Sequence, residues 1–135
     1  MSKLGDSFFT LIDCMDGRTK AYAIKYGQEV FDAQFADTIT EAGIDKVLAE
    51  LETGSELEKS IQNKIDISVY KHHSKGLLIA GHDDCAGNPV TDEAHKDQIK
   101  NAVKKIKNMV PQEVKVRGIF IKLYPSLVEE VIAKE

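Results

Sequence analysis

Five side chains in this sequence have types and spacing suited to metal chemistry. Cys14, His82 and Cys85 carry thiol and imidazole groups, the ligands that zinc prefers in proteins. Three protein ligands leave a fourth position for water or substrate, which is typical of a catalytic zinc site. Asp16 and Arg18 follow Cys14 closely, and a carboxylate oriented by a guanidinium can accept a hydrogen bond beside a metal.

Two apolar segments must bring these groups together. Residues 7–14 and 76–81 are short apolar runs, which predict buried strands rather than helices. Cys14 lies at the end of the first run, and His82 and Cys85 lie just beyond the second. Because parallel strands end at the same edge of a sheet, we expect the three ligands to meet in one crevice there.

The remaining patterns alternate between helix and strand. Helices are expected over residues 19–26 with Gly27 as the stop, over 44–53, from the capping Ser55 to about His73, from Thr91 or Asp92 to Pro111, and finally from Ser126. Further strands are expected over residues 35–40 and, near one edge, over 114–123. This order predicts an α/β fold, in which residues 1–135 form one domain with a mostly parallel central sheet flanked by helices.

The composition excludes several kinds of partner. The chain has 135 residues and a formal charge of −4, and its lysines are interspersed with acids, so we expect no nucleic-acid partner. There is no uninterrupted apolar stretch that would form a signal peptide or a membrane span, so we expect a cytoplasmic protein with no membrane partner. A reducing compartment favours cysteines that act as ligands over cysteines that form a disulfide.

The two ligand segments resemble the motifs of β-class carbonic anhydrases. Residues 14–18 read Cys-Met-Asp-Gly-Arg and match the pattern Cys-x-Asp-x-Arg, and residues 81–85 read Gly-His-Asp-Asp-Cys and match Gly-His-x-x-Cys. The strand expected to end at residue 123 is similar to the closing strand of that family. The resemblance extends over residues 7–124.

This resemblance implies a function and a role for each residue. The function is zinc-dependent, reversible hydration of carbon dioxide to bicarbonate, with Zn²⁺ held by Cys14, His82 and Cys85. Asp16 and Arg18 would form a hydrogen-bonded catalytic pair beside the metal. In the family, the residue matching Asp16 can instead ligate the metal and close the site, and the sequence leaves both states open.

Departures from the family pattern leave other functions open. Residues 40–44 read Thr-Glu-Ala-Gly-Ile where relatives often have Arg-x-Ala-Gly-Asn, so the substrate pocket is altered. Alternatives are a hydrolase of carbonyl sulfide or carbon disulfide, and a non-catalytic zinc-binding module. The family's N-terminal arm is missing or reduced, yet we expect a homodimer or higher homo-oligomer, because pairing would cover the strand at residues 114–123.

Simpler interpretations exist for each residue. Cys14 and Cys85 could be core residues or a disulfide, and Asp16 and Arg18 could form an ordinary surface ion pair.

The other polar residues near these motifs have simpler roles too. We expect Asp83 and Asp84 only to hold a turn. His72 and His73 are expected to be solvated at a helix end, and His95 to be an ordinary residue of a lysine-rich helix. The step from Ala42 to Gly43 either approaches the site or is only a loop.

Overall fold

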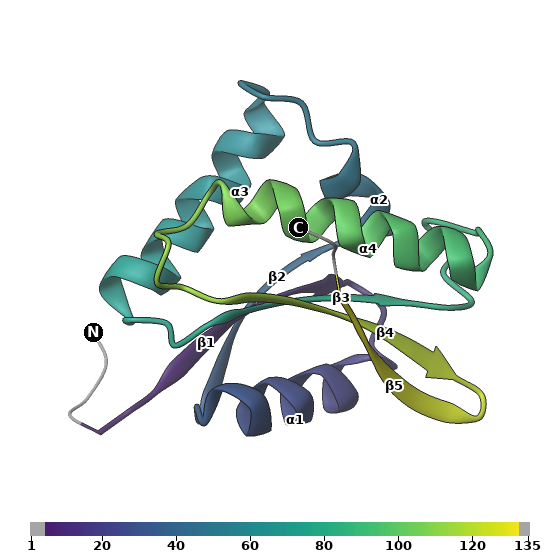
Figure 1. Cartoon of the computed structure of the whole chain (residues 1–135), viewed down its shortest axis with the longest axis horizontal. Coiled ribbons are helices and arrows are strands. Elements are labelled where there is room, and N and C mark those ends of the chain that lie inside the picture. Colours follow the sequence, from purple (N-terminus) through teal and green to yellow (C-terminus); the bar gives the residue numbers. More distant parts are fainter. Residues whose placement is uncertain (1–4, 133–135) are drawn as a thin grey trace.

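The computed structural model describes residues 5–132 and contains a five-stranded sheet between two layers of helices (Figure 1). The strands are β1 (Phe8–Cys14), β2 (Phe35–Glu41), β3 (Leu77–His82), β4 (Val116–Leu123) and β5 (Ser126–Val131). The helices are α1 (Lys20–Phe31), α2 (Ile44–Ala49), α3 (Glu56–Asp66) with its π-helical extension η1 (Ile67–Lys71), and α4 (Asp92–Lys107). The α/β architecture expected from the alternation is confirmed.

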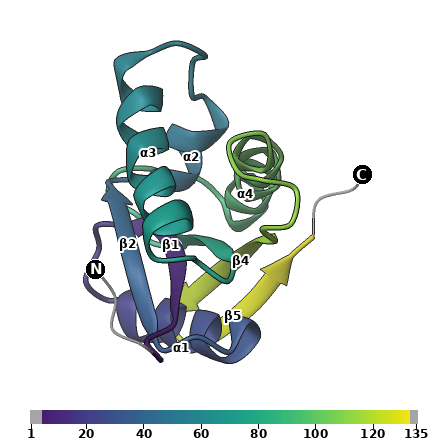
Figure 2. The ribbon, with the colours of Figure 1, turned by 90° about the vertical axis from the view of Figure 1, so that its left-hand side faces the viewer.

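The sheet order is β2-β1-β3-β4-β5, and all neighbouring strands are parallel except β4 and β5. Helix α1 covers one face, while α2, α3 and α4 cover the other (Figure 2). One apolar cluster lies on each face, so the central strands β1 and β3 are buried on both sides. This burial explains their continuous apolar sequences.

The final helix expected from Ser126 is wrong, because this segment forms the antiparallel strand β5. Its β-branched residues Val128 and Val131 pack on opposite faces of the sheet. The backbone of β5 also satisfies the hydrogen-bonding groups of β4, which would otherwise be exposed at an edge. Tertiary pairing therefore decides the conformation of a segment whose own sequence has no strong preference.

Helix α1 continues past Gly27, where a stop was expected. A Cβ atom at Gly27 would lie 2.1 Å from Cε2 of Phe9, so this glycine makes room for an aromatic ring of β1. A similar contact joins Gly76 and Phe31, at 2.2 Å from the nearest ring atom. The helix ends instead at Asp32, which has a left-handed conformation with φ of 51°.

Two helices begin at their predicted capping residues, whereas α2 ends at Ala49 and not at residue 53 as expected. The Ser55 hydroxyl accepts a hydrogen bond from the Glu58 amide, and the Thr91 hydroxyl accepts one from the Ala94 amide. Helix α4 ends at Lys107, a few residues before Pro111, and its apolar residues Ile99, Ala102, Val103 and Ile106 are buried. No helix within residues 5–132 is long and apolar enough to cross a membrane.

Candidate metal centre

Three metal-ligating side chains meet at the carboxyl edge of the sheet, as predicted. Cys14 is the last residue of β1, His82 is the last residue of β3, and Cys85 follows in the next turn. The strands β1 and β3 are parallel neighbours, which places their ends side by side. The parallel topology therefore brings together residues that are far apart in sequence.

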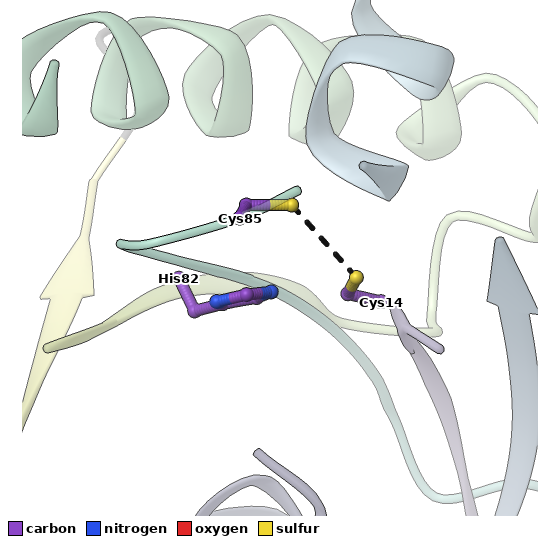
Figure 3. Close-up of side chains that lie close together, drawn as sticks. All are labelled: Cys14, His82 and Cys85. Atoms are coloured by element: carbon purple, nitrogen blue, oxygen red, sulfur yellow. Dashed lines mark hydrogen bonds between the residues drawn. The ribbon is translucent and has the colours of Figure 1, made fainter. Parts of the chain in front are cut away.

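The ligand atoms of Cys14, His82 and Cys85 all lie within 4.8 Å of one another (Figure 3). The two sulfur atoms are 3.9 Å apart, and each cysteine is only 4% exposed. Both are free thiols, so the disulfide alternative is not what the structure contains. Burial raises the pKa of the Cys85 thiol, and the nearby Cys14 raises that pKa further.

His82 is oriented so that one ring nitrogen is available to this cluster. Its Nδ1 atom lies 2.5 Å from the backbone oxygen of Asp83, which can only accept a hydrogen bond, so Nδ1 is the donor. The Nε2 atom is buried and has no hydrogen-bond partner. A buried polar atom without a partner is costly, and a metal ion would satisfy this one.

The donor set fits a tetrahedral zinc ion. With Zn–S bonds of about 2.3 Å, tetrahedral angles separate two sulfur ligands by about 3.8 Å. The 3.9 Å between the sulfurs of Cys14 and Cys85 is close to this separation. The hydrogen bond from His82 Nδ1 to a backbone carbonyl is the usual support for a metal-binding imidazole. The three residues could therefore hold a metal ion.

Asp16 and Arg18 lie beside the cluster as a closely bonded pair. The Arg18 guanidinium donates to both carboxylate oxygens of Asp16, at 2.7 Å from Nη2 to Oδ2 and 3.1 Å from Nε to Oδ1. This contact holds the pKa of the Asp16 carboxyl well below its usual range. The Oδ2 atom of Asp16 is 4.0 Å from Nε2 of His82. The carboxylate is thus near the cluster but is held by Arg18.

Arg18 also joins the two segments that carry the ligands. Its Nη1 donates to the Asp84 carboxylate and its Nη2 to the Asp84 backbone oxygen, each at 3.1 Å. Asp84 has a φ of 50°, and the carboxylate of Asp83 accepts the amide of Leu123. Asp83 and Asp84 therefore lie in the predicted turn, and their contacts with Leu123 and Arg18 also hold the loop in place. A hollow on the surface beside Cys85 is lined by Arg18, Asp84, Ala86, Pro89 and Val90.

A buried ion pair behind Cys14 was not predicted from the sequence. The Asp13 carboxylate is fully buried and accepts from Nζ of Lys20 at 3.0 Å and from the hydroxyl of Thr19 at 2.8 Å. Lys20 also donates to the backbone oxygens of Cys14 and Asp16. Burial raises the pKa of Asp13, while Lys20 and Thr19 oppose that rise. The charged Asp13 inside an apolar strand was the available signal.

A second buried polar network contains His95, which was expected to be an ordinary residue of its helix. His95 is fully buried, and its Nδ1 is 2.6 Å from the carboxylate of Asp45. The Asn88 side chain donates to the same carboxylate at 3.0 Å. The burial of His95 was not predicted, because the many lysines of α4 suggested an exposed helix. His95 lies on the buried face of that helix.

His72 also has partners, contrary to the expectation of a solvated side chain. Its Nδ1 lies 2.8 Å from the Asp37 carboxylate, and its ring stacks on Phe8 with centroids 4.0 Å apart. This pair lies near the opposite end of β2 from the candidate metal centre. It fixes η1 against the sheet.

Comparison with known families agrees with this geometry. The family described as "Putative carbonic anhydrase" matches residues 4–131, nearly the whole chain. The chain belongs to this carbonic anhydrase family. No curated protein gives a significant sequence match.

Solved β-carbonic anhydrases share the fold of this family member. The enzyme from Streptococcus mutans superposes with a TM-score of 0.65 at 16% identity, over 98% of this chain and 86% of that one. The isoform I enzyme from Trichomonas vaginalis gives 0.63 at 17%, over 100% and 89%. One of the enzymes described as tetrameric from Sordaria macrospora gives 0.63 at 12%, over 94% and 82%. The sequence resemblance to β-class carbonic anhydrases is thereby confirmed at the level of family and fold.

Proposed function

We propose that this protein catalyses the zinc-dependent, reversible hydration of carbon dioxide to bicarbonate. The observation that carries the proposal is the convergence of Cys14, His82 and Cys85 within 4.8 Å, in a chain of the carbonic anhydrase family. The unpartnered Nε2 of His82 supports metal binding at this point. Zinc bound there would supply a nucleophile by lowering the pKa of water.

In this proposal, Cys14, His82 and Cys85 are the zinc ligands, and Asp16 and Arg18 are the catalytic pair. Asp16 is ionised and can accept a hydrogen bond from the attacking water, orienting it toward the substrate carbon. Arg18 contacts both oxygens of Asp16 and so keeps this carboxylate from taking a ligand position itself. The hollow beside Cys85 gives a small substrate access to the site.

Stopped-flow measurement of carbon dioxide hydration by the zinc-loaded protein tests this function. We expect hydration that is abolished when a chelator removes zinc, and a rate that rises through the alkaline range, because thiolate ligands donate charge to the metal and leave bound water less acidic. Parallel assays with carbonyl sulfide and carbon disulfide test the alternative substrates. A zinc-loaded protein inactive toward carbon dioxide at alkaline pH would contradict the proposal and favour a non-catalytic module.

We also propose that the protein is a cytoplasmic homodimer or higher homo-oligomer. The original reason for expecting an oligomer is wrong, because β5 already pairs with β4. The opposite edge strand, β2, has no pairing partner beyond β1 among residues 5–132, and the Sordaria macrospora enzymes of the same fold are described as tetrameric. Light scattering that shows a monomer at high micromolar concentration would rule out this assembly.

A further inference from the structure

A buried polar network supports the loop that carries Cys85. Asp45, Asn88 and His95 are 2%, 1% and 0% exposed, respectively. The Asp45 carboxylate accepts from His95 Nδ1 at 2.6 Å through one oxygen and from Asn88 Nδ2 at 3.0 Å through the other. Asn88 also donates to the side-chain oxygen of Gln98 at 2.7 Å. Three elements of the fold meet here: helix α2, the loop after β3, and helix α4.

Asn88 is the member of this network that belongs to the Cys85 loop. Its backbone amide donates to the backbone oxygen of Cys85 at 3.2 Å, which closes a tight turn between the two residues. Its side chain is held by groups from both helices. Any displacement of Asn88 is therefore transmitted to Cys85 through a short segment of backbone.

The backbone of the same loop rests against the start of α2. A Cβ atom on Gly43 would lie 2.7 Å from the backbone oxygen of Gly87, and the φ of Gly43 is +64°. Of the two alternatives left open for the step from Ala42 to Gly43, this contact supports a close approach to the loop that carries Cys85. Backbone contact on one side and the polar network on the other fix the position of the loop.

This network adds less to the free energy of unfolding than its many contacts suggest. Burying polar groups such as these costs desolvation energy, and well-packed apolar residues often stabilise a fold equally well. The Nε2 atom of His95 is buried without a hydrogen-bond partner, which adds to this cost. Directional hydrogen bonds do, however, fix orientation in a way that apolar packing does not.

We propose that Asp45, Asn88 and His95 are positioning residues that set the place of the Cys85 thiolate and thereby the affinity for zinc. This inference rests on the proposed zinc site. None of the three side chains is bonded to a side chain of Cys14, His82 or Cys85, and the network acts through the turn from Cys85 to Asn88, whose backbone amide also interacts with the Cys85 thiol. Partners outside the ligand set commonly change metal affinity by about 10- to 100-fold.

The test compares Asn88→Ala with Ser68→Ala in the full chain. Ser68 is a matched control, since it is 2% exposed and bonds Thr10 and Asp37, yet its bonding partners lie toward the other end of β1 and β2. Zinc affinity is measured by competition with a chelator, and the thiolate-to-metal charge-transfer bands of the cobalt-substituted proteins report the placement of Cys85. We expect Asn88→Ala to weaken zinc binding at least about tenfold and to alter the cobalt spectrum, with both properties unchanged in Ser68→Ala.

The outcomes separate this inference from the proposed function. If the wild-type protein binds no zinc, the proposed site fails and the inference falls with it. If the wild-type protein binds zinc, but Asn88→Ala binds it equally well or both variants lose affinity alike, the positioning role is overturned and the proposed site stands. If Asn88→Ala does not fold, Asp45→Asn, which preserves shape and removes the charge, is judged by the same affinity and spectrum.

Discussion

Two buried histidines near the end of β3 have almost the same exposure and different surroundings. His82 is 1% exposed and His95 is 0% exposed, and within residues 5–132 their Nε2 atoms are the two buried side-chain nitrogen or oxygen atoms without a hydrogen-bond partner. The Nδ1 of His82 donates to a backbone carbonyl, whereas the Nδ1 of His95 meets a carboxylate. His82 faces two thiols, and His95 lies beside the ring of Phe120.

The comparison shows that neighbours, not burial, decide what an imidazole can do. The free nitrogen of His82 has two sulfur atoms within reach and belongs to a group of three side chains that could hold a metal ion. The free nitrogen of His95 has no second ligand nearby among the described residues, so we assign it to the support of the fold and the loop. Each of the following predictions changes one side of this comparison.

The largest expected effect follows from removing the proposed ligand. His82→Ala should weaken zinc binding by more than about 100-fold, because even indirect partners of a ligand are worth 10- to 100-fold. Carbon dioxide hydration should be lost with the metal. Zinc content after dialysis against a weak chelator measures the effect, and stoichiometric zinc in the variant would refute the assignment of this ligand.

Removing the other histidine should act on stability in the absence of metal. His95→Ala leaves Asp45 buried without its main partner, and breaking a buried pair in this way costs about 3–5 kcal/mol of the free energy of unfolding. His82→Ala should change that free energy much less in metal-free protein. Urea denaturation of both variants in the presence of a chelator measures the difference, and equal losses would remove the distinction drawn here.

Arg18→Ala tests whether Arg18 keeps the Asp16 carboxylate away from the metal site beside His82. Asp16 would be released next to Nε2 of His82, now 4.0 Å away, and could take the fourth ligand position. We expect hydration to fall by about 10- to 100-fold while zinc remains bound. Arg117→Ala is the matched control, since Arg117 pairs with Glu130 on the surface at 3.1 Å. Unchanged rates in Arg18→Ala would exclude the proposed gating role.

The smallest effect concerns the charge of Asp16 in the metal-free protein. Its pKa in the folded state lies below the value of 3.8 for an unperturbed carboxyl, so its contribution to stability is complete above about pH 3.8 and is lost as the pH falls through the folded-state pKa. Asp16→Asn should therefore be slightly less stable than wild type at neutral pH, with the difference shrinking only below about pH 3.8. Denaturation curves at several pH values check this, and a difference that shrinks at higher pH would contradict it.

Much of the fold and the ligand cluster could be predicted because the signals were local. Continuous apolar runs identified β1 and β3, and the shared edge of parallel strands then placed Cys14 beside His82 and Cys85. The features that were missed depend on distant partners. Strand β5 forms because β4 offers an edge, and His95 is buried because Asp45 and Asn88 meet it from other elements. Periodicity within one helix contains no information on such partners.

The contacts of Gly27 with Phe9 and of Gly76 with Phe31 have a consequence for related sequences. Each aromatic ring fills the volume that a side chain at the glycine would need. Neither member of a pair can change size freely, so natural selection acts on the two positions jointly. In homologues we therefore expect covariation, such that a residue larger than glycine at position 27 accompanies a residue smaller than phenylalanine at position 9.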